Sequence, residues 1–276
     1  MRTPSGLGTR KMRLAVAGLA LLGVIAVPSA VAAAPTGHDT HPGVKPTIVL
    51  EHGAWADGSS WSAVVSRLQK DGYTVDVPPN PLRGVAADSA YLASYLATVP
   101  GPIVLVGHSY GGFVTTNAAT GNTNVKALVY VDAYIPAAGE TINGLTSQFP
   151  GSQIAPTALS FVPSAGGVVD AYVAPAQFRS ILANDLSATQ AAELAATQRP
   201  IAASTLGDVS GPPAWTSIPS WAVVGTEDHA IPPAALTFMA QRAHAAITRI
   251  DASHLSLISQ PGTVTSVIEQ AARHTS

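Results

Sequence analysis

The stretch Gly107-His108-Ser109-Tyr110-Gly111 constrains the fold most, because it places G-x-S-x-G directly after the apolar run 102–106. Small residues two positions before and two positions after a serine allow a strand to turn sharply into a helix. Residues 113–119 then have the pattern of a helix. The order of strand, turn and helix predicts a nucleophile elbow that presents the Ser109 hydroxyl. The alternative is a structural turn, since a chain with 24 glycines contains some by chance.

Strands alternate with helices along most of the chain, which predicts an α/β fold with a mostly parallel central sheet flanked by helices. Tyr91, Leu92, Tyr95 and Leu96 are expected on one face of the second helix. The strands are predicted at 47–50, 73–77, 102–106, 125–131, 221–224 and 248–250, and the helices at 61–68, 88–98, 113–119, 232–243 and 264–271.

The segment 136–213 interrupts this alternation with a composition rich in Ala, Ser, Thr and Gln. We expect it to be a mainly helical cap insertion. Its clearest helix is predicted over 187–198, where Ser187 and Gln190 form an S-x-x-Q capping box and Pro200 ends the helix. The aromatic residues of the insertion could form an apolar lid or could only pack the cap onto the sheet, and the sequence leaves this open: Phe149, Phe161, Tyr172 and Phe178.

The N-terminal residues 1–34 have the three parts of a secretory signal peptide: a basic segment, the apolar run 14–27 and a small-residue stretch. Cleavage is expected after Ala32 or Ala33, because cleavage after Ala34 would leave Pro35 at the first mature position. The alternative is a membrane anchor, but the apolar run is shorter than the roughly 20 residues that a span requires. We therefore expect a secreted, extracellular protein without a stable membrane anchor. Residues 35–45 are predicted to be a linker, and 46–276 one domain.

Charge and cysteine content exclude several functions. Removing the four basic residues of the first 34 residues leaves 10 of 14 basic residues against 16 acidic residues, so the mature chain is mildly acidic. This argues against nucleic acid as a partner, because nucleic-acid-binding proteins concentrate Lys and Arg on one face. The absence of cysteine excludes disulfides, thiolate metal sites and a cysteine nucleophile. The sequence does not distinguish a monomer from a dimer.

A serine nucleophile needs a base and an acid that orients the base, and the chain supplies both in order. His254 follows the last predicted strand, and Asp228 follows the strand before it. The carboxyl ends of parallel strands meet in one crevice, so Ser109, Asp228 and His254 are predicted to come together as a triad. The alternatives are an ordinary loop histidine and a turn aspartate. Asp132, at the end of the 125–131 strand, competes for the role of the acid, and Glu227 does so more weakly.

An oxyanion needs two N–H donors, one after the nucleophile and one from the loop after an earlier strand. Gly53 permits a tight turn in that earlier loop, which predicts the N–H groups of Ala54 and Tyr110 as the pair. Trp55 and Tyr110 are expected to contact the substrate. The two histidines that precede Gly53 and Ser109, His52 and His108, are expected to support the loop and the elbow. Neither a metal nor a cofactor is expected.

Together, four motifs resemble the α/β-hydrolase superfamily: residues 52–55, residues 107–112, residues 225–228 with Ile231-Pro232, and Ser253-His254. The resemblance runs from residue 47 to the end and is to the group of plant methyl-ester esterases of the salicylate-binding type, hydroxynitrile lyases and their bacterial relatives. It implies hydrolysis of small carboxylic esters beneath a helical cap, without a cofactor. The lyases have a threonine and a lysine where this chain has Gly53 and Leu255, which favours the esterases. Ser109 also separates the chain from relatives that carry aspartate at the elbow.

The sequence thus predicts a secreted serine carboxylesterase that acts on a small-molecule ester. The same catalytic groups could serve a lactonase, a thioesterase or an acyltransferase, which differ in pocket shape and water access. A hydrolase-like ligand receptor with negligible turnover is an alternative from another class, and the complete triad weighs against it.

Overall fold

The computed structural model describes residues 45–275, as two sets of elements: a central sheet with its helices, and a cap. The expected signal peptide, residues 1–34, and linker residues 35–44 lie outside the described residues. Between residues 45 and 275, no helix combines the length and the apolarity needed to cross a bilayer.

The central sheet has six strands in the order β2-β1-β3-β4-β8-β9, and every neighbouring pair is parallel. Every residue of β3 and β8 is buried. Burial on both faces explains why the runs 103–106 and 221–224 are apolar throughout and do not alternate with polar residues. The strands are β1 (Thr47–Glu51), β2 (Val75–Asp76), β3 (Ile103–His108), β4 (Val125–Val131), β8 (Ser220–Gly225) and β9 (Ala246–Ile250).

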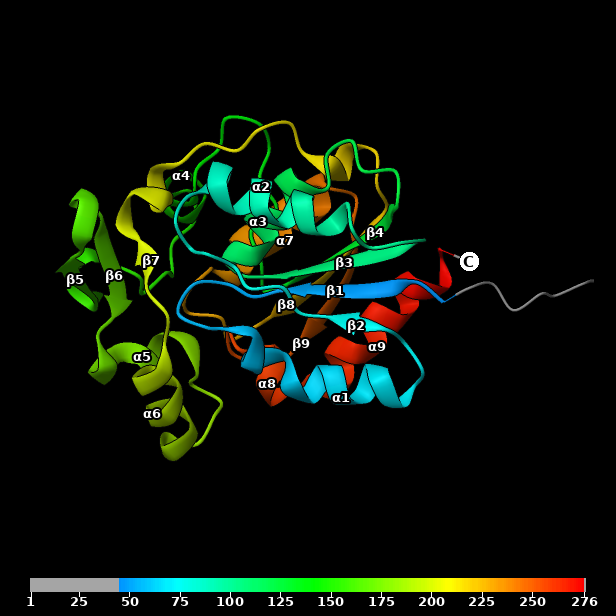
Figure 1. Cartoon of the computed structure of the whole chain (residues 1–276). Helices are drawn as coiled ribbons and strands as arrows, with labels where there is room; N and C mark the ends of the chain where they lie inside the picture. Colours follow the sequence, from blue (N-terminus) through cyan, green and yellow to red (C-terminus); the bar gives the residue numbers. More distant parts are fainter. Residues whose placement is uncertain (1–44, 276) are drawn as a thin grey trace, which may run out of the picture. The chain divides into compact units, whose positions relative to one another are not determined.

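Helices cover both faces of this sheet, which confirms the predicted fold class. In Figure 1, α1 and α9 lie below the sheet and α2, α3 and α7 above it. The helices are α1 (Ser62–Lys70), α2 (Val85–Leu96), α3 (Tyr110–Ala118), α7 (Pro233–Arg242), α8 (Ser256–Ser259) and α9 (Pro261–Arg273), and the 3₁₀ segment Gly58–Trp61 precedes α1.

Helix α2 differs from the prediction in its start and in its buried face. It begins at Val85, after Gly84, rather than at Asp88. Leu92 and Leu96 are buried as expected, but Tyr91 is 42% exposed. The buried stripe instead includes Asp88, because its carboxylate accepts N–H groups from the turn before the helix and so does not need water.

The cap lies between β4 and β8, and Figure 1 shows it beyond the carboxyl ends of the central strands. The predicted capping box is confirmed: Ser187 and Gln190 cap α6 reciprocally. The cap also contains a three-stranded antiparallel sheet that the sequence analysis did not anticipate. Its elements are α4 (Ile142–Ser147), β5 (Leu159–Pro163), β6 (Val169–Val173), α5 (Pro175–Leu182), α6 (Ala188–Thr197) and β7 (Ile201–Ala202), with 3₁₀ segments at Pro156–Ala158, Ala165–Gly167, Ala203–Gly207 and Ala214–Thr216.

Candidate active site

Ser109 lies in a sharp turn between β3 and α3, as the elbow motif predicts. Its backbone has φ 53° and ψ −124°, a conformation that side-chain-bearing residues rarely adopt. The turn closes because glycines flank it: a Cβ on Gly107 would lie 2.7 Å from the backbone of Gly111, and one on Gly111 would lie 2.5 Å from the Glu51 carbonyl oxygen. The packing around the turn therefore holds Ser109 in its strained conformation.

The loop after β1 packs directly against this turn. A Cβ on Gly53 would lie 2.6 Å from the Cβ of Ser109, so only glycine permits this approach. His52 supports the loop: its Nδ1–H donates to the Gly53 carbonyl oxygen (2.9 Å) and its Nε2 accepts the N–H of Asn80 (3.1 Å). These bonds fix a neutral tautomer of His52, in agreement with a pKa that burial lowers.

Ser109, His254 and Asp228 form a continuous hydrogen-bonded chain of side chains. The Ser109 hydroxyl lies 2.8 Å from His254 Nε2, and His254 Nδ1 lies 2.7 Å from Asp228 Oδ2. All three side chains are almost fully buried, with His254 2% exposed. The structure thus brings together the three residues that the sequence analysis selected.

Asp228 and its competitor Asp132 differ in what they contact. Asp228 Oδ1 accepts the N–H groups of Ala230 and Ile231, both at 2.8 Å, which aims Oδ2 at the imidazole. Asp132 accepts the N–H of Gly225 (2.7 Å) and the hydroxyl of Ser256. The two oxygens of Asp132 therefore bond the end of β8 and the start of α8. The His254 imidazole bonds Asp228.

The electrostatic surroundings of His254 favour the imidazolium. Burial lowers its pKa, but the charge and hydrogen bond of Asp228, with a further contribution from Asp132, raise the pKa above its ordinary value overall. Burial and the nearby charge of Asp228 raise the pKa of Asp132 to about 7. Asp228 and Asp132 together can thus stabilise a positive charge that develops on the His254 imidazole.

His108 supports the base loop. Its Nε2–H donates to the backbone carbonyl oxygen of His254 at 2.9 Å. Burial lowers the pKa of His108 well below its ordinary value, so the ring is neutral at physiological pH. Among residues 45–275, no cluster of three or more histidine, aspartate or glutamate side chains is placed to hold a metal ion.

A cavity of about 480 Å³, including its opening to solvent, has Ser109 in its wall. Ala54, Trp55 and Tyr110 line it, so the residues expected around the substrate lie at this cavity. The Tyr110 hydroxyl donates to the Asp88 carboxylate (2.7 Å). The Tyr110 backbone N–H has no acceptor within the helix, because Tyr110 is the first residue of α3. The cap contributes mainly apolar and uncharged residues to the remaining wall: Ile142, Asn143, Thr146, Ile154, Ile201 and Leu206.

The four aromatic residues that could have formed a lid do not line this cavity. Phe178 is buried in the core, Phe149 packs against Phe238 with ring centroids 5.4 Å apart, and Phe161 is 48% exposed. Tyr172 is half-buried on β6. The aromatic residues in the cavity wall are instead Trp55, Tyr110 and Tyr134, from the sheet domain: Tyr110 begins α3, and the other two lie in loops.

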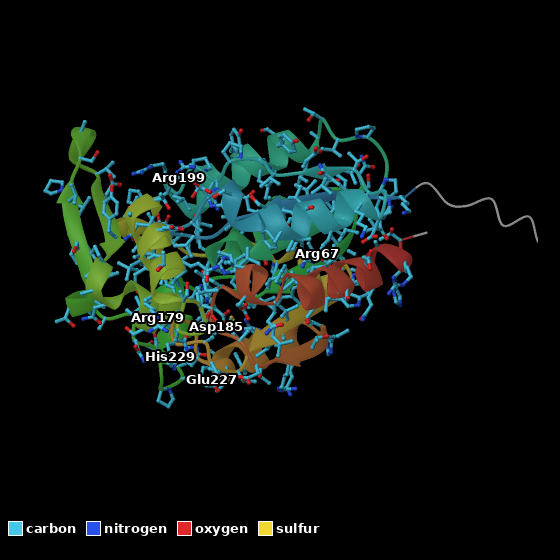
Figure 2. All side chains as sticks on the ribbon, turned by 90° about the horizontal axis from the view of Figure 1, so that it is seen from below. Arg67, Arg179, Asp185, Arg199, Glu227 and His229 are labelled. Carbon is cyan, nitrogen blue, oxygen red and sulfur yellow. The ribbon has the colours of Figure 1, made fainter. Side chains whose placement is uncertain are left out.

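The cap holds the loop that carries His254. Asp185 accepts the N–H (3.0 Å) and the hydroxyl of Ser253, and the Leu182 carbonyl oxygen accepts the N–H of Leu255 (3.2 Å). Figure 2 shows Asp185 near Arg179 and His229, where α5 meets the loop after β8. His229 Nδ1–H donates to the Ser180 carbonyl oxygen (2.8 Å) at this border.

Three residues of the site, Asp88, Asn80 and Asp185, could not be selected from the sequence patterns. Each bonds a functional loop over a long distance in the chain: 28 residues separate Asn80 from His52, and 68 separate Asp185 from Ser253. Only Asp88 left a local signal in the sequence, because it stands among the apolar positions of a helix. A carboxylate buried there must accept hydrogen bonds from nearby donors.

Comparisons with known proteins support the same family. The family described as "Alpha/beta hydrolase family" matches residues 48–267. Over 110 residues, 35% of this chain, the chain is 32% identical to a carbendazim hydrolyzing esterase from a Nocardioides strain. The match spans 46% of that relative, about half of its length.

Several solved structures are similar in fold. Polyneuridine aldehyde esterase has a TM-score of 0.71 at 18% identity, covering 82% of this chain and 98% of its own. A pyrethroid hydrolase from Sphingobium faniae has a TM-score of 0.67 at 22% identity, covering 83% and 97%. Tomato methylketone synthase I, complexed with 2-tridecanone, has a TM-score of 0.71 at 17% identity, covering 84% and 100%. Identities this low establish the fold alone.

Proposed function

This chain belongs to the alpha/beta hydrolase family, and from that membership we propose that it is a serine carboxylesterase acting on small esters. The observation that supports this most is the hydrogen-bonded chain from Ser109 through His254 to Asp228, with Ser109 in the wall of a cavity lined mainly by apolar groups. Such a cavity favours uncharged substrates, because a charged group would lose its hydration without a partner.

The proposed reaction begins when the Ser109 hydroxyl attacks the ester carbonyl carbon and His254 Nε2 accepts its proton. The N–H groups of Ala54 and Tyr110 would stabilise the negative oxygen of the tetrahedral intermediate. The intermediate collapses as the imidazolium returns the proton to the leaving alkoxide. The alcohol departs, and Ser109 remains acylated.

Deacylation repeats these steps with water as the nucleophile. His254 accepts a proton from the attacking water, and the same N–H groups stabilise the second oxyanion. Asp228 holds the Nδ1–H tautomer throughout and stabilises the positive charge. Collapse of the intermediate releases the carboxylic acid and returns the proton to Ser109.

A turnover screen tests the proposal. The substrates are p-nitrophenyl esters of graded acyl length, methyl esters of aromatic acids, and simple lactones, each assayed with the purified protein. We expect turnover of simple esters. Turnover of lactones alone would replace the esterase by a lactonase, and absence of turnover on every substrate would favour a ligand receptor.

The pH dependence follows from the raised pKa of His254. The base accepts the Ser109 proton only when neutral, so activity is lost as pH falls through that pKa. We expect kcat/KM to rise with pH in one step whose midpoint lies above histidine's ordinary value of about 6.5. In Asp132→Asn, one of the charges that raise the pKa is removed, so the midpoint should move to lower pH. A step that stays in place in this variant would contradict the electrostatic account.

We also propose that the protein is exported, on the basis of residues 1–34. Protein recovered from the medium of an exporting host should begin near Ala33 or Ala34, as mass spectrometry of the intact chain would show. A chain that starts at Pro35 should be active without detergent. Active protein found only in membranes, with residues 14–27 attached, would mean that the segment is an anchor.

A further inference from the structure

A second cavity has Trp55 in its wall but not Ser109. It has about 320 Å³ of empty space, including its opening. Among residues 45–275, Trp55 is the one residue that lines both this cavity and the cavity of Ser109. Trp55 is thus the part of the wall that the two cavities share.

The wall is held in place by the cap. The indole N–H of Trp55 donates to the Ala171 carbonyl oxygen of β6 (2.9 Å), and its backbone N–H donates to the Arg199 carbonyl oxygen (3.0 Å). Its backbone has φ 58°, a left-handed conformation that a bulky residue adopts at a cost. The side chain is therefore fixed in the wall that both cavities share.

With the indole in place the second cavity is narrow and holds about one water molecule, so a larger group would enter it only if the side chain at position 55 were smaller. The apolar wall of the cavity comes from Phe178, Leu194 and Ile258, and from Leu255, which directly follows the base. Its polar residues already have partners. Gln198 bonds the backbone of Val173, and the Thr197 hydroxyl donates to the Glu193 carbonyl oxygen. The Asp57 carboxylate accepts the N–H and the hydroxyl of Ser59, and the Ser60 hydroxyl donates to the Asp57 carbonyl oxygen. An apolar ligand would consequently leave few polar groups unsatisfied there.

The second cavity continues into a surface groove between α1 and α6. Ser59, Ser60, Leu194, Thr197 and Ile258 line both the cavity and the groove. The groove opens past Ala63 of α1 and Glu193 of α6. A group that occupied the second cavity could thus extend toward solvent.

We propose that Trp55 limits the size of the alcohol part of the substrate, and that the second cavity is an alcohol subsite that the indole closes off from Ser109. This inference rests on the proposed esterase function. His254 must protonate the leaving alkoxide, so the alcohol lies on the side of the base. Leu255 places the second cavity on that side. The enzyme accordingly acts on esters of small alcohols, with the acyl part in the cavity of Ser109.

The test compares two ester series in wild type and Trp55→Ala. In the first, the acyl part is butanoate and the alcohol is methanol, butanol or benzyl alcohol. In the second, the alcohol is methanol and the acyl chain grows. We expect Trp55→Ala to raise the benzyl-to-methyl ratio of kcat/KM about tenfold or more, a range typical of added apolar contacts. Because Trp55 also lines the cavity of Ser109, the ratios of the acyl series should change by a smaller factor.

Two further variants keep the test interpretable if Trp55→Ala folds poorly. Trp55→Leu opens the wall in part and should shift the alcohol ratio in the same direction. Trp215→Ala is the matched control, because its indole also donates to a backbone carbonyl, that of Pro136 (2.8 Å), but does not line either cavity. It should leave both ratios unchanged.

The outcomes separate this inference from the function on which it rests. Wild-type protein without turnover of any ester would remove the proposed function itself. Active, folded Trp55 variants with an unchanged alcohol ratio, or with a larger shift in the acyl series than in the alcohol series, would overturn the alcohol subsite while leaving the esterase in place.

Discussion

Ser109→Ala should lower kcat for ester hydrolysis by about 10⁴-fold or more, since the proposed covalent step has no other nucleophile. The fold should persist for two reasons. The Ser109 hydroxyl bonds His254 Nε2 and does not hold the turn itself, and alanine at φ 53° is no more strained than serine. Steady-state kinetics and circular dichroism measure the two effects. A fluorophosphonate probe should label Ser109 in the wild type and lose that site in the variant.

Ser94→Ala provides the matched control for this substitution. Ser94 is exposed on α2 and its hydroxyl donates to the carbonyl oxygen of Ala90 in the same helix. Its variant should retain wild-type turnover and labelling. Near-normal turnover in folded Ser109→Ala, or probe attachment at another residue, would falsify the serine mechanism.

Asp228→Asn should lower kcat on the order of a thousandfold or more. The asparagine oxygen can still accept the N–H groups of Ala230 and Ile231, so the amide nitrogen then faces His254 Nδ1. Two donors cannot bond each other, and the imidazole must take the tautomer with hydrogen on Nε2. That tautomer cannot accept the Ser109 proton.

Asp132→Asn is the comparison that tests the choice of acid. Its oxygen can keep the bond from Gly225 and its amide can donate to Ser256, so the local structure should survive. We expect kcat to fall less than about tenfold, since the direct partner of the imidazole remains. The kinetics of Asp228→Asn and Asp132→Asn on one ester test this choice. A larger loss of kcat in Asp132→Asn would assign the role of the acid to Asp132, at the end of β4.

The sequence predicted the elbow and the triad because local and global signals agree there. Gly107 and Gly111 mark a tight turn, the apolar run marks a buried strand, and the parallel alternation brings strand ends to one edge. The order of Ser109, Asp228 and His254 along the chain then selects the three residues. Each of these inferences uses neighbours in the sequence or the topology of a parallel sheet.

The cap was less predictable, because its structure depends on contacts between distant residues. Strand β5 is mostly exposed, so it lacks the alternation that marks a half-buried strand, and only its pairing with β6 makes it extended. Likewise, Tyr91 satisfies the helical spacing but faces solvent, while Asp88 is buried against Tyr110. Contacts with residues that are distant in the chain determine the structure in both cases. The periodicity of the sequence carries no information about such contacts.

The hydrogen bonds between the cap and the two functional loops have a consequence for how this protein can change over evolutionary time. The cap bonds Trp55 through Ala171 and Arg199, and the base loop through Leu182 and Asp185. Ala171, Arg199 and Leu182 accept with their backbone carbonyl oxygens and only Asp185 with its side chain, so a cap from a relative would keep these bonds only if its backbone followed the same path. A chimera should therefore take residues 55 and 253–255 from the same parent as the cap, so that both loops keep the backbone path to which they are bonded.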